Sequence, residues 1–328
     1  MSLSDLGIVV IGRNEGSRLI DCLSSLSSQK GKVVYVDSGS NDGSVVVAER
    51  LGAFVVELDG AKPFTAARAR NEGLAAIAAR NPNVRFVQFV DGDCELIDTW
   101  LNEALEFVNQ KNDVAVVCGR RRERHPERSL YNRLCDIEWN SQVGEALACG
   151  GDSLMRVDAF NEVNGFQAEL IAGEEPELCS RIRERGWKVW RLDAEMTRHD
   201  AAITRFSQWW LRAVRSGYAV AEISMQHPLS SSAFWEKREV ARAVLWAGFL
   251  PLIIAGASYF HPTALLGILI YPLQVIRVAI RCGATVSEPL IYGGFMLVAK
   301  FAQFQGILKY LIRACVKHPI QLIEYKQK

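Results

Sequence analysis

The sequence lacks the biases and motifs by which several protein classes are recognised. Its 38 basic and 37 acidic side chains leave a net charge of +1, which argues against a general nucleic-acid-binding protein. Neither G-x-G-x-x-G nor G-x-x-x-x-G-K-S/T occurs, so dinucleotide-binding and P-loop folds lack their phosphate loops. The chain instead reads Gly12-Arg13-Asn14-Glu15-Gly16 after its first apolar run. A nucleotide, if one binds, has to be held in another way.

Cysteine patterns typical of disulfide scaffolds or zinc sites are also absent. The eight cysteines are scattered and include no C-x-x-C pair. The N-terminal residues enter a predicted strand almost at once, which leaves no room for a signal peptide. We therefore expect reduced thiols and a catalytic part on the cytoplasmic side. With 328 residues, the chain can hold one large α/β domain and a smaller appendage.

Charged side chains are missing from residues 243–276, a run of 34 residues. His261 and Pro262 interrupt this run, so it predicts two apolar helices joined by a turn. Basic residues flank both ends, which predicts a hairpin with its ends on the cytoplasmic face of the inner membrane: Arg238, Arg242, Arg277 and Arg281. Each arm has only about 16–18 residues, so a re-entrant hairpin is one alternative. A buried helical subdomain of a soluble protein is the other.

A third apolar tract covers residues 289–312 and carries Lys300 and Lys309. This composition is typical of an amphipathic helix at the membrane surface, or of a membrane helix. The chain is therefore predicted to contain a catalytic domain, a linker and a membrane-associated helical region, at residues 1–226, 227–242 and 243–328.

Strand and helix periods alternate over the first 240 residues. Apolar runs predict strands at residues 7–11, 33–36, 53–58, 84–90 and 187–192. Helical patterns lie at residues 17–28, 65–79 and 206–225, and another ends at Leu51. This alternation predicts an α/β fold, with a mostly parallel sheet flanked by helices.

Asp91-Gly92-Asp93 directly follows the predicted strand at 84–90. Both carboxylates stand where that strand ends, which is the edge at which open α/β sheets bind ligands. Paired aspartates suit Mg²⁺ or Mn²⁺, which often bind through one or two carboxylates and substrate phosphates. Taken alone, Asp-Gly-Asp is more typical of an ordinary turn. Its interpretation therefore depends on the rest of the chain.

Three motifs precede Asp91-Gly92-Asp93, each beside a predicted strand. They are Ile-Gly-Arg-Asn-Glu at 11–15, Val-Asp-Ser-Gly-Ser-Asn-Asp-Gly at 36–43 and Ala-Arg-Asn-Glu-Gly at 69–73. The series resembles the GT-A-fold inverting glycosyltransferases of family 2, such as cellulose and hyaluronan synthases and dolichol-phosphate mannose synthases. The resemblance covers about residues 5–220 and indicates a membrane-associated, bacterial-type member. It implies a Rossmann-like transferase fold, a nucleotide-diphosphate sugar donor and bound Mn²⁺ or Mg²⁺.

The resemblance also assigns the donor side of the site. The residues implied to line the nucleotide are Ile11, Arg13, Glu15, Asp37, Ser38, Arg70 and Asp91. Asp37 would accept a hydrogen bond from the base, and Asp91 and Asp93 would hold the cation. An exposed helical arginine is the ordinary alternative for Arg70. The family often has proline and tyrosine at positions 11 and 13, so the choice between a UDP- and a GDP-sugar stays open.

Glu174 and Glu175 resemble the family's Glu-Asp motif, in which the second acid is the catalytic base. The resemblance assigns this role to Glu175, with Glu174 as the alternative. Pro176 suits a first helical turn, where acids are favoured by the helix dipole. A purely helix-capping role for these acids is the simpler interpretation.

Four further positions complete the implied site. His199 follows a predicted strand and is a candidate third metal ligand, although a structural histidine is as common. Asp152 would shape the acceptor side, unless it is only a turn acid. The helix at 206–225 carries further acceptor candidates, because tryptophan stacks on sugars and arginine binds phosphate: Trp209, Trp210 and Arg212.

We therefore expect a membrane-associated, metal-dependent inverting glycosyltransferase that acts on a lipid-linked or saccharide acceptor in polysaccharide or glycolipid assembly. A polyprenyl-phosphate sugar synthase is the nearest alternative. A nucleotidyltransferase or a non-catalytic sugar-nucleotide-binding subunit would belong to a different class. The loop at Gly12-Arg13-Asn14-Glu15-Gly16 fits a nucleotidyltransferase poorly, because it is not a glycine-rich basic loop.

Overall fold

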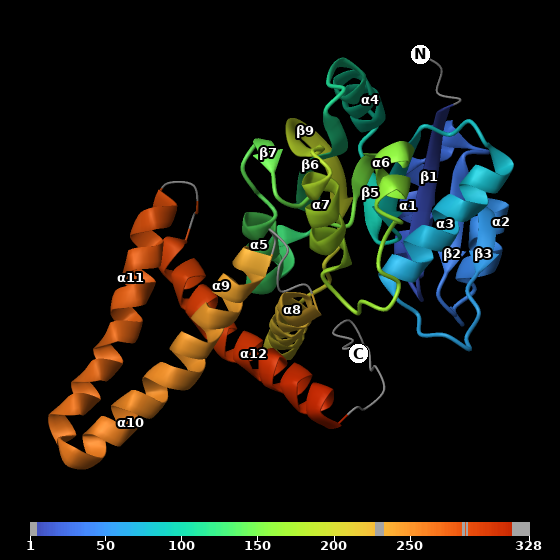
Figure 1. Ribbon diagram of the computed structural model, residues 1–328. Coiled ribbons are helices and arrows are strands. Elements are labelled where there is room, and N and C mark those ends of the chain that lie inside the picture. Colours follow the sequence, from blue (N-terminus) through green and yellow to red (C-terminus); the bar gives the residue numbers. More distant parts are fainter. Residues whose placement is uncertain (1–4, 227–232, 284–285, 287, 317–328) are drawn as a thin grey trace. The chain divides into compact units, whose positions relative to one another are not determined.

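The computed structural model describes residues 5–226, 233–283, 286 and 288–316 (Figure 1). The chain divides into two compact units, Met1–Ala202 and Ile203–Lys328. This division lies before the predicted boundary at residue 226, because helix α8 (Phe206–Gln226) packs within the second unit. Part of the predicted linker at 227–242 lies outside the described residues. The remainder, residues 233–242, belongs to helix α9 (Ala233–Ala243).

The first unit is built on one nine-stranded sheet. Its strand order is β3-β2-β1-β4-β8-β6-β9-β5, and β7 pairs with β9. The strands are β1 (Leu6–Gly12), β2 (Val33–Asp37), β3 (Phe54–Glu57), β4 (Phe86–Asp91), β5 (Cys94–Leu96), β6 (Val114–Glu123), β7 (Gly144–Ala146), β8 (Ser153–Arg156) and β9 (Lys188–His199). The central strands are apolar and almost wholly buried, as strands covered on both faces must be.

The sheet is mixed, whereas the sequence predicted a mostly parallel one. Strands β3, β2, β1 and β4 run parallel, and so do β6 and β9. Strands β8, β5 and β7 pair antiparallel with their neighbours. An apolar period predicts a strand but does not predict whether it runs parallel or antiparallel to its neighbours.

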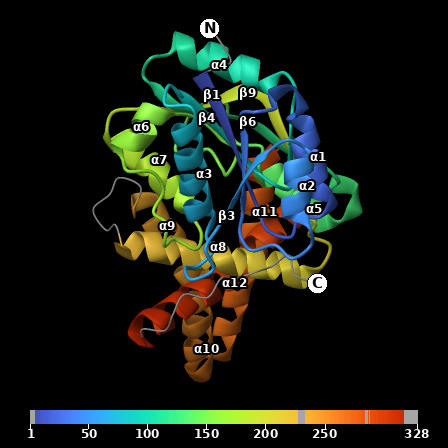
Figure 2. The ribbon, with the colours of Figure 1, turned by 90° about the vertical axis from the view of Figure 1, so that its right-hand side faces the viewer.

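Helices cover both faces of this sheet (Figure 2). Side chains of α3, α6 and α7 pack on one face with Val9 and Ile11, and those of α1, α2 and α4 pack on the other with Ile8 and Val10. The helical segments are α1 (Ser17–Ser25), η2 (Ser27–Gln29), α2 (Ser44–Arg50), α3 (Ala66–Arg80), α4 (Trp100–Gln110), η3 (Pro126–Arg128), α5 (Leu130–Glu138), α6 (Val157–Glu162) and α7 (Glu174–Glu184).

The second unit consists of helices. After α8 and α9 come the π-helical turn η4 (Val244–Phe249), α10 (Leu250–Phe260), η5 (Pro262–Leu269), α11 (Ile270–Cys282) and α12 (Pro289–Val316). Glycines let α8 and α12 approach closely, because a Cβ at Gly306 would collide with the Val214 backbone and one at Gly217 with the Gln303 backbone.

The predicted apolar hairpin is present, with its turn at His261 and Pro262. Its arms lie side by side (Figure 1). The Tyr271 hydroxyl donates to the Trp246 carbonyl at 2.9 Å. The helices continue beyond the uncharged run, so the arms are longer than predicted. Three stretches are long and apolar enough to cross a membrane: Lys237–Phe260, Pro262–Cys282 and Pro289–Val316.

Candidate active site

The loops that follow β1 and β2 are joined by hydrogen bonds. The Asn14 backbone N–H donates to Ser40 Oγ at 2.9 Å, and the Asn41 N–H donates to Asn14 Oδ1 at 2.8 Å. At the end of β2, Asp37 accepts from the Tyr35 hydroxyl and from the backbone N–H of Ser40, at 2.9 and 2.7 Å. Asp37 is only 1% exposed, so it organises this loop. Its predicted contact with a base stays a prediction.

The other first-loop residues predicted to contact the nucleotide lie around this junction. Ile11 is buried in β1, whereas Arg13 is exposed and its guanidinium lies 5.5 Å from the centre of the Phe64 ring. Glu15 forms an ion pair at 2.7 Å with Arg18, the second residue of α1. Ser38 donates its backbone N–H to the Gly12 carbonyl at 3.0 Å.

Arg70 joins the two acidic motifs. From α3, its guanidinium lies 2.8 Å from Asp91 Oδ1 at the end of β4 and 2.8 Å from Glu174 Oε1 at the start of α7. The side chain is 3% exposed, so it is not an exposed helical arginine. Burial alone would lower the Arg70 pKa, but the two carboxylates outweigh burial and raise it. The structure thus brings residues 91 and 174 to one charged cluster.

Asp152 and Arg121 hold Asp91 from the other side. Asp152 is fully buried, accepts the Asp91 backbone N–H at 2.8 Å and pairs with Arg121 at 2.8 Å. Thr197 Oγ1 donates to the second Asp152 oxygen at 2.9 Å. In this arrangement Asp152 positions Asp91 and offers no exposed atom to an acceptor.

Gly151 leaves room for the Arg70–Asp91 pair. A Cβ at this position would lie 2.7 Å from Asp91 Oδ2 and 2.8 Å from Arg70 Nη2. Any larger residue would therefore displace one of the two side chains.

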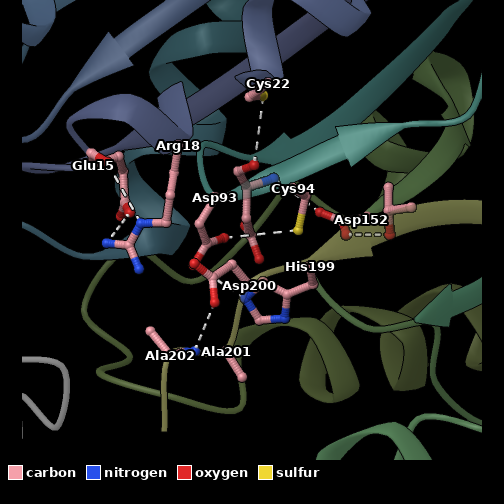
Figure 3. A network of polar contacts seen from close by, with 12 residues as sticks. Glu15, Arg18, Cys22, Asp93, Cys94, Asp152, His199, Asp200, Ala201 and Ala202 are labelled. Carbon is pink, nitrogen blue, oxygen red and sulfur yellow. Dashed lines mark hydrogen bonds and ion pairs between the residues drawn. The ribbon is translucent and has the colours of Figure 1, made fainter. Parts of the chain in front are cut away.

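Asp93 and His199 meet at the junction of β5 and β9 (Figure 3). Their Oδ2 and Nε2 atoms are 3.0 Å apart, and both residues are 7% exposed. The His199 ring stacks on Trp139 with a centroid distance of 4.7 Å. Its Nδ1 atom is buried and has no hydrogen-bond partner among the described residues. A cation shared by the two residues would be bound by the facing atoms, Asp93 Oδ2 and His199 Nε2.

The donor set fits Mn²⁺ or Mg²⁺, with His199 favouring Mn²⁺. Ligand atoms of Asp93, Cys94 and His199 lie within 4.8 Å of one another, and those of Asp91, Cys94 and Asp152 form a second such group. Burial and the neighbouring carboxylates raise the pKa of the Cys94 thiol, and sulfur is a poor ligand for Mn²⁺ and Mg²⁺, which favour oxygen ligands. The oxygen and nitrogen ligands are therefore Asp93 and His199, with Asp91 beside them.

Glu175 has a different environment from Glu174. It is 6% exposed, and its Oε1 accepts the Cys149 backbone N–H and the Cys179 thiol, the latter at 3.0 Å. Among the described residues Glu175 forms no ion pair, whereas Glu174 is bound to Arg70. The helix starts after Gly173, whose φ of 79° lies in the left-handed region.

The predicted acceptor residues on α8 belong to the second unit. The Trp209 ring packs edge-on against Phe295, with centroids 5.0 Å apart. Trp210 Nε1 donates to Gln305 Oε1 at 2.8 Å. These two side chains thus contribute to helix packing, and an acceptor role for them and for Arg212 stays a prediction.

Sequence reasoning missed Arg121 and Trp139. Arg121 belongs to a run of three arginines, Arg120 to Arg122, that ends an apolar strand pattern at 114–118. Such a run at a strand end was a usable signal for an anion-facing edge. Trp139 lies just after α5, and no local pattern connects it with His199, which is 60 residues further along the chain.

Comparisons with known proteins agree with this fold. Residues 7–163 match the family model described as glycosyl transferase family 2. The chain is 27% identical over 199 residues to the succinoglycan biosynthesis protein ExoA of Rhizobium meliloti, covering 57% of this chain and 60% of that protein. It is 27% identical over 246 residues to the pre-mycofactocin glycosyltransferase of Mycobacterium tuberculosis, covering 68% and 48%. The chain thus spans about half to three fifths of these relatives.

Among solved structures, the mannosyltransferase PcManGT of Pyrobaculum calidifontis, in complex with GDP-Man and Mn²⁺, has a similar fold. The TM-score is 0.59 at 17% identity, over 94% of this chain and 87% of that one. The mixed sheet with helices on both faces is thus the GT-A fold. The match to glycosyltransferase family 2 covers residues 7–163, a little less than half of the chain.

Proposed function

We propose that this protein is a membrane-associated, cation-dependent glycosyltransferase that inverts the configuration of the transferred sugar. The donor is a UDP- or GDP-sugar, and the acceptor is a hydroxyl of a lipid-linked or saccharide molecule in polysaccharide or glycolipid assembly. One observation carries this proposal. The buried Arg70 guanidinium contacts both Asp91, which lies beside the proposed cation ligands, and Glu174, which precedes the candidate base. Leaving-group and base machinery thus lie in one cluster.

In the proposed reaction, an acceptor oxygen forms a bond to the anomeric carbon from the face opposite the diphosphate. The bond from that carbon to the diphosphate oxygen breaks, and the nucleoside diphosphate leaves with the electron pair. The acceptor proton passes to Glu175. A single displacement of this kind inverts the anomeric centre.

Glu175 is the better candidate for the base because of what each carboxylate contacts. The Glu174 carboxylate is already engaged by the Arg70 guanidinium at 2.8 Å. The described contacts of Glu175 are with neutral donors only, namely a backbone N–H and a thiol. Glu174 then helps to hold Arg70 in place.

Asp93 and His199 would hold the cation, with Asp91 next to them. When bound, the cation supplies positive charge that offsets the charge growing on the departing diphosphate. Arg70 and Arg121 add fixed positive charge around Asp91. Guanidinium groups suit phosphate oxygens, which supports a diphosphate on this side.

The relatives and the second unit support the proposed setting. The similarity to a succinoglycan biosynthesis protein favours a polysaccharide precursor as acceptor. The three membrane-length helical stretches favour an acceptor at the membrane. We place the protein in the inner membrane with its catalytic unit on the cytoplasmic face, because basic residues flank both ends of the hairpin: Arg238, Arg242, Arg277 and Arg281.

A donor panel tests the proposal. Full-length protein in detergent is incubated with UDP- and GDP-sugars, Mn²⁺ and membrane extract, and both nucleoside diphosphate release and labelled product are measured. Asp93→Ala should lose Mn²⁺-dependent turnover. Glu175→Gln should still bind donor but transfer about 10²–10⁴-fold more slowly, because the base is gone.

Glu184→Gln is the matched control, since Glu184 is exposed at the other end of α7. It should leave the rate unchanged. Normal turnover in Glu175→Gln would contradict the assignment of the base. Inactivity of the wild-type protein with every donor would contradict the enzymatic function itself.

A further inference from the structure

Two cysteine thiols surround the carboxylate proposed as the base. Cys149 lies in the loop between β7 and β8, and Cys179 lies one helical turn after Glu175 on α7. The Cys149 and Cys179 sulfur atoms are 3.7 Å apart, and Cys179 Sγ is 3.0 Å from Glu175 Oε1. One ligand atom from each of the three residues lies within 4.8 Å of the other two. Neither thiol takes part in the proposed reaction.

We infer that Cys149, Glu175 and Cys179 form a binding site for a thiophilic divalent cation such as Zn²⁺, and that a cation bound there inhibits sugar transfer. The binding site is argued from geometry alone. The inhibitory effect rests on the proposed function, because it requires Glu175 to be the base.

The sulfur separation matches a tetrahedral zinc site. Two thiolates at about 2.3 Å from a tetrahedral ion lie about 3.8 Å apart, close to the distance between Cys149 and Cys179. A carboxylate oxygen at about 2.0 Å from the ion would lie about 3.5 Å from each sulfur. The distance of 3.0 Å between Cys179 Sγ and Glu175 Oε1 would therefore lengthen by about 0.5 Å once the thiol proton has left. Three protein ligands leave a fourth position for water.

The ligand types separate this site from the one at Asp93 and His199. Thiolates select Zn²⁺ and similar cations, whereas Mn²⁺ and Mg²⁺ favour oxygen ligands. Mn²⁺ would thus bind at the donor site, while Zn²⁺ also binds beside the base. Asp93, Cys94 and His199 form the competing cluster for Zn²⁺.

In the absence of such a cation, this cluster leaves the Glu175 carboxylate free to act as the base. Burial raises the pKa of the Cys149 thiol, and the hydrogen bond with Cys149, followed by burial, raises that of Cys179. Both thiols are therefore protonated, and a bound cation has to displace both protons. Glu175 then binds the cation through an oxygen and can no longer accept the acceptor proton.

Metal titration of the full-length protein in detergent tests the site directly. Zn²⁺ affinity is measured by competition with a chelating dye, and Co²⁺ serves as a spectroscopic probe, because thiolate ligands give it a strong near-ultraviolet charge-transfer band. Cys149→Ala and Cys179→Ala should each weaken Zn²⁺ binding by at least about 100-fold, since even outer-shell ligand partners contribute 10–100-fold. Cys149 is only half-buried, so this variant should fold even if Cys179→Ala does not.

Cys135→Ala is the matched control, because Cys135 is a buried thiol outside the three clusters. It should leave Zn²⁺ affinity unchanged, and His199→Ala should retain the Co²⁺–thiolate band. Unchanged affinity in Cys149→Ala, or a thiolate band lost in His199→Ala, would overturn the site.

The inhibitory effect has its own measurement. Zn²⁺ should inhibit Mn²⁺-supported transfer by the wild-type protein, and Cys149→Ala should resist this inhibition. Equal inhibition of both proteins would overturn the inhibitory role. If no donor supports transfer, the proposed function fails together with the inhibitory role, whereas the Zn²⁺ titration still decides whether the site exists.

Discussion

Positively charged side chains around Asp91 allow several carboxylates to lie close together. Burial alone would raise the Asp91 pKa, but Arg70 and Arg121 outweigh burial and lower it, so the group is ionised at neutral pH. Both arginines are themselves largely buried, with side chains 3% and 15% exposed. Removing either one would leave a carboxylate without its partner, which costs more than the pair itself contributes.

Arg70→Ala should therefore destabilise the protein as well as inactivate it. Breaking a buried ion pair by removing one partner costs about 3–5 kcal/mol. In this variant Glu174 loses Arg70, and Asp91 keeps only Arg121, at 3.9 Å. The unfolding midpoint in detergent, followed by circular dichroism, should fall by several degrees. Arg80→Ala is the control on the same helix, because Arg80 is exposed and only covers the Phe54 ring. An equal loss of stability in both variants would contradict the bridging role.

Gly151→Ala tests the space beside Arg70 and Asp91. The added methyl group would have to displace one of these side chains, at a cost of about 1–3 kcal/mol. We expect a higher Mn²⁺ requirement for donor turnover, together with a lower unfolding midpoint. Gly60→Ala is the control, because its Cβ would meet only Phe64, at 3.7 Å. Wild-type Mn²⁺ dependence in Gly151→Ala would show that the contact is unimportant.

At the scale of helices and strands, the sequence predicted the half of the sheet that has simple periodicity. Predicted strands at 7–11 and 33–36 agree with β1 and β2 to within one residue at each end, and helix α7 begins at Glu174, which puts Pro176 in its first turn as predicted. The short strands β5, β7 and β8 were not predicted, because three or four residues carry no readable period. Their pairing depends on partners distant in the chain, such as β9 for β5 and β7.

The site was predictable to the same degree. Acids at strand and helix ends, such as Asp93 and Glu175, could be proposed because local sequence marks those ends. The contact of His199 with Trp139 and the support of Asp91 by Asp152 were not, since tertiary packing alone creates them. Asp152 resembled a turn residue from its neighbours, although it is fully buried.

The packing of α8 on α12 depends on glycines at their contact. Gly306→Leu should separate the two helices, because a Cβ at this position already collides with the Val214 backbone. We expect a loss of at least about 1–3 kcal/mol, measured as a lower unfolding midpoint of helical circular dichroism in detergent. Gly294→Ala on the same helix is the control. A Cβ there meets nothing within 4 Å, so it should be neutral or slightly stabilising. Equal behaviour of both variants would contradict close helix packing.

At the scale of the whole molecule, the two units expose very different surfaces. In the second unit large apolar side chains are exposed over the hairpin, with Leu252 at 72%, Phe260 at 75% and Leu273 at 63%. Only 11% and 6% of the apolar windows in Lys237–Phe260 and Pro262–Cys282 is buried within the protein. A continuous apolar surface of this kind needs a partner such as lipid. A buried subdomain of a soluble protein would instead cover these residues.

The full-length protein should therefore sediment with membranes, resist an alkaline carbonate wash and dissolve only with detergent. Leu273→Arg should shift part of it to the wash, because an arginine near the bilayer centre costs about 2.5–3.5 kcal/mol on insertion scales. Val46→Arg is the matched control, since Val46 is also an exposed apolar residue, 48% accessible, but lies on α2 in the first unit. Release of the wild-type protein by carbonate would contradict integral membrane insertion. If Leu273→Arg and Val46→Arg are retained equally, the hairpin lies at the membrane surface, where an added arginine costs little.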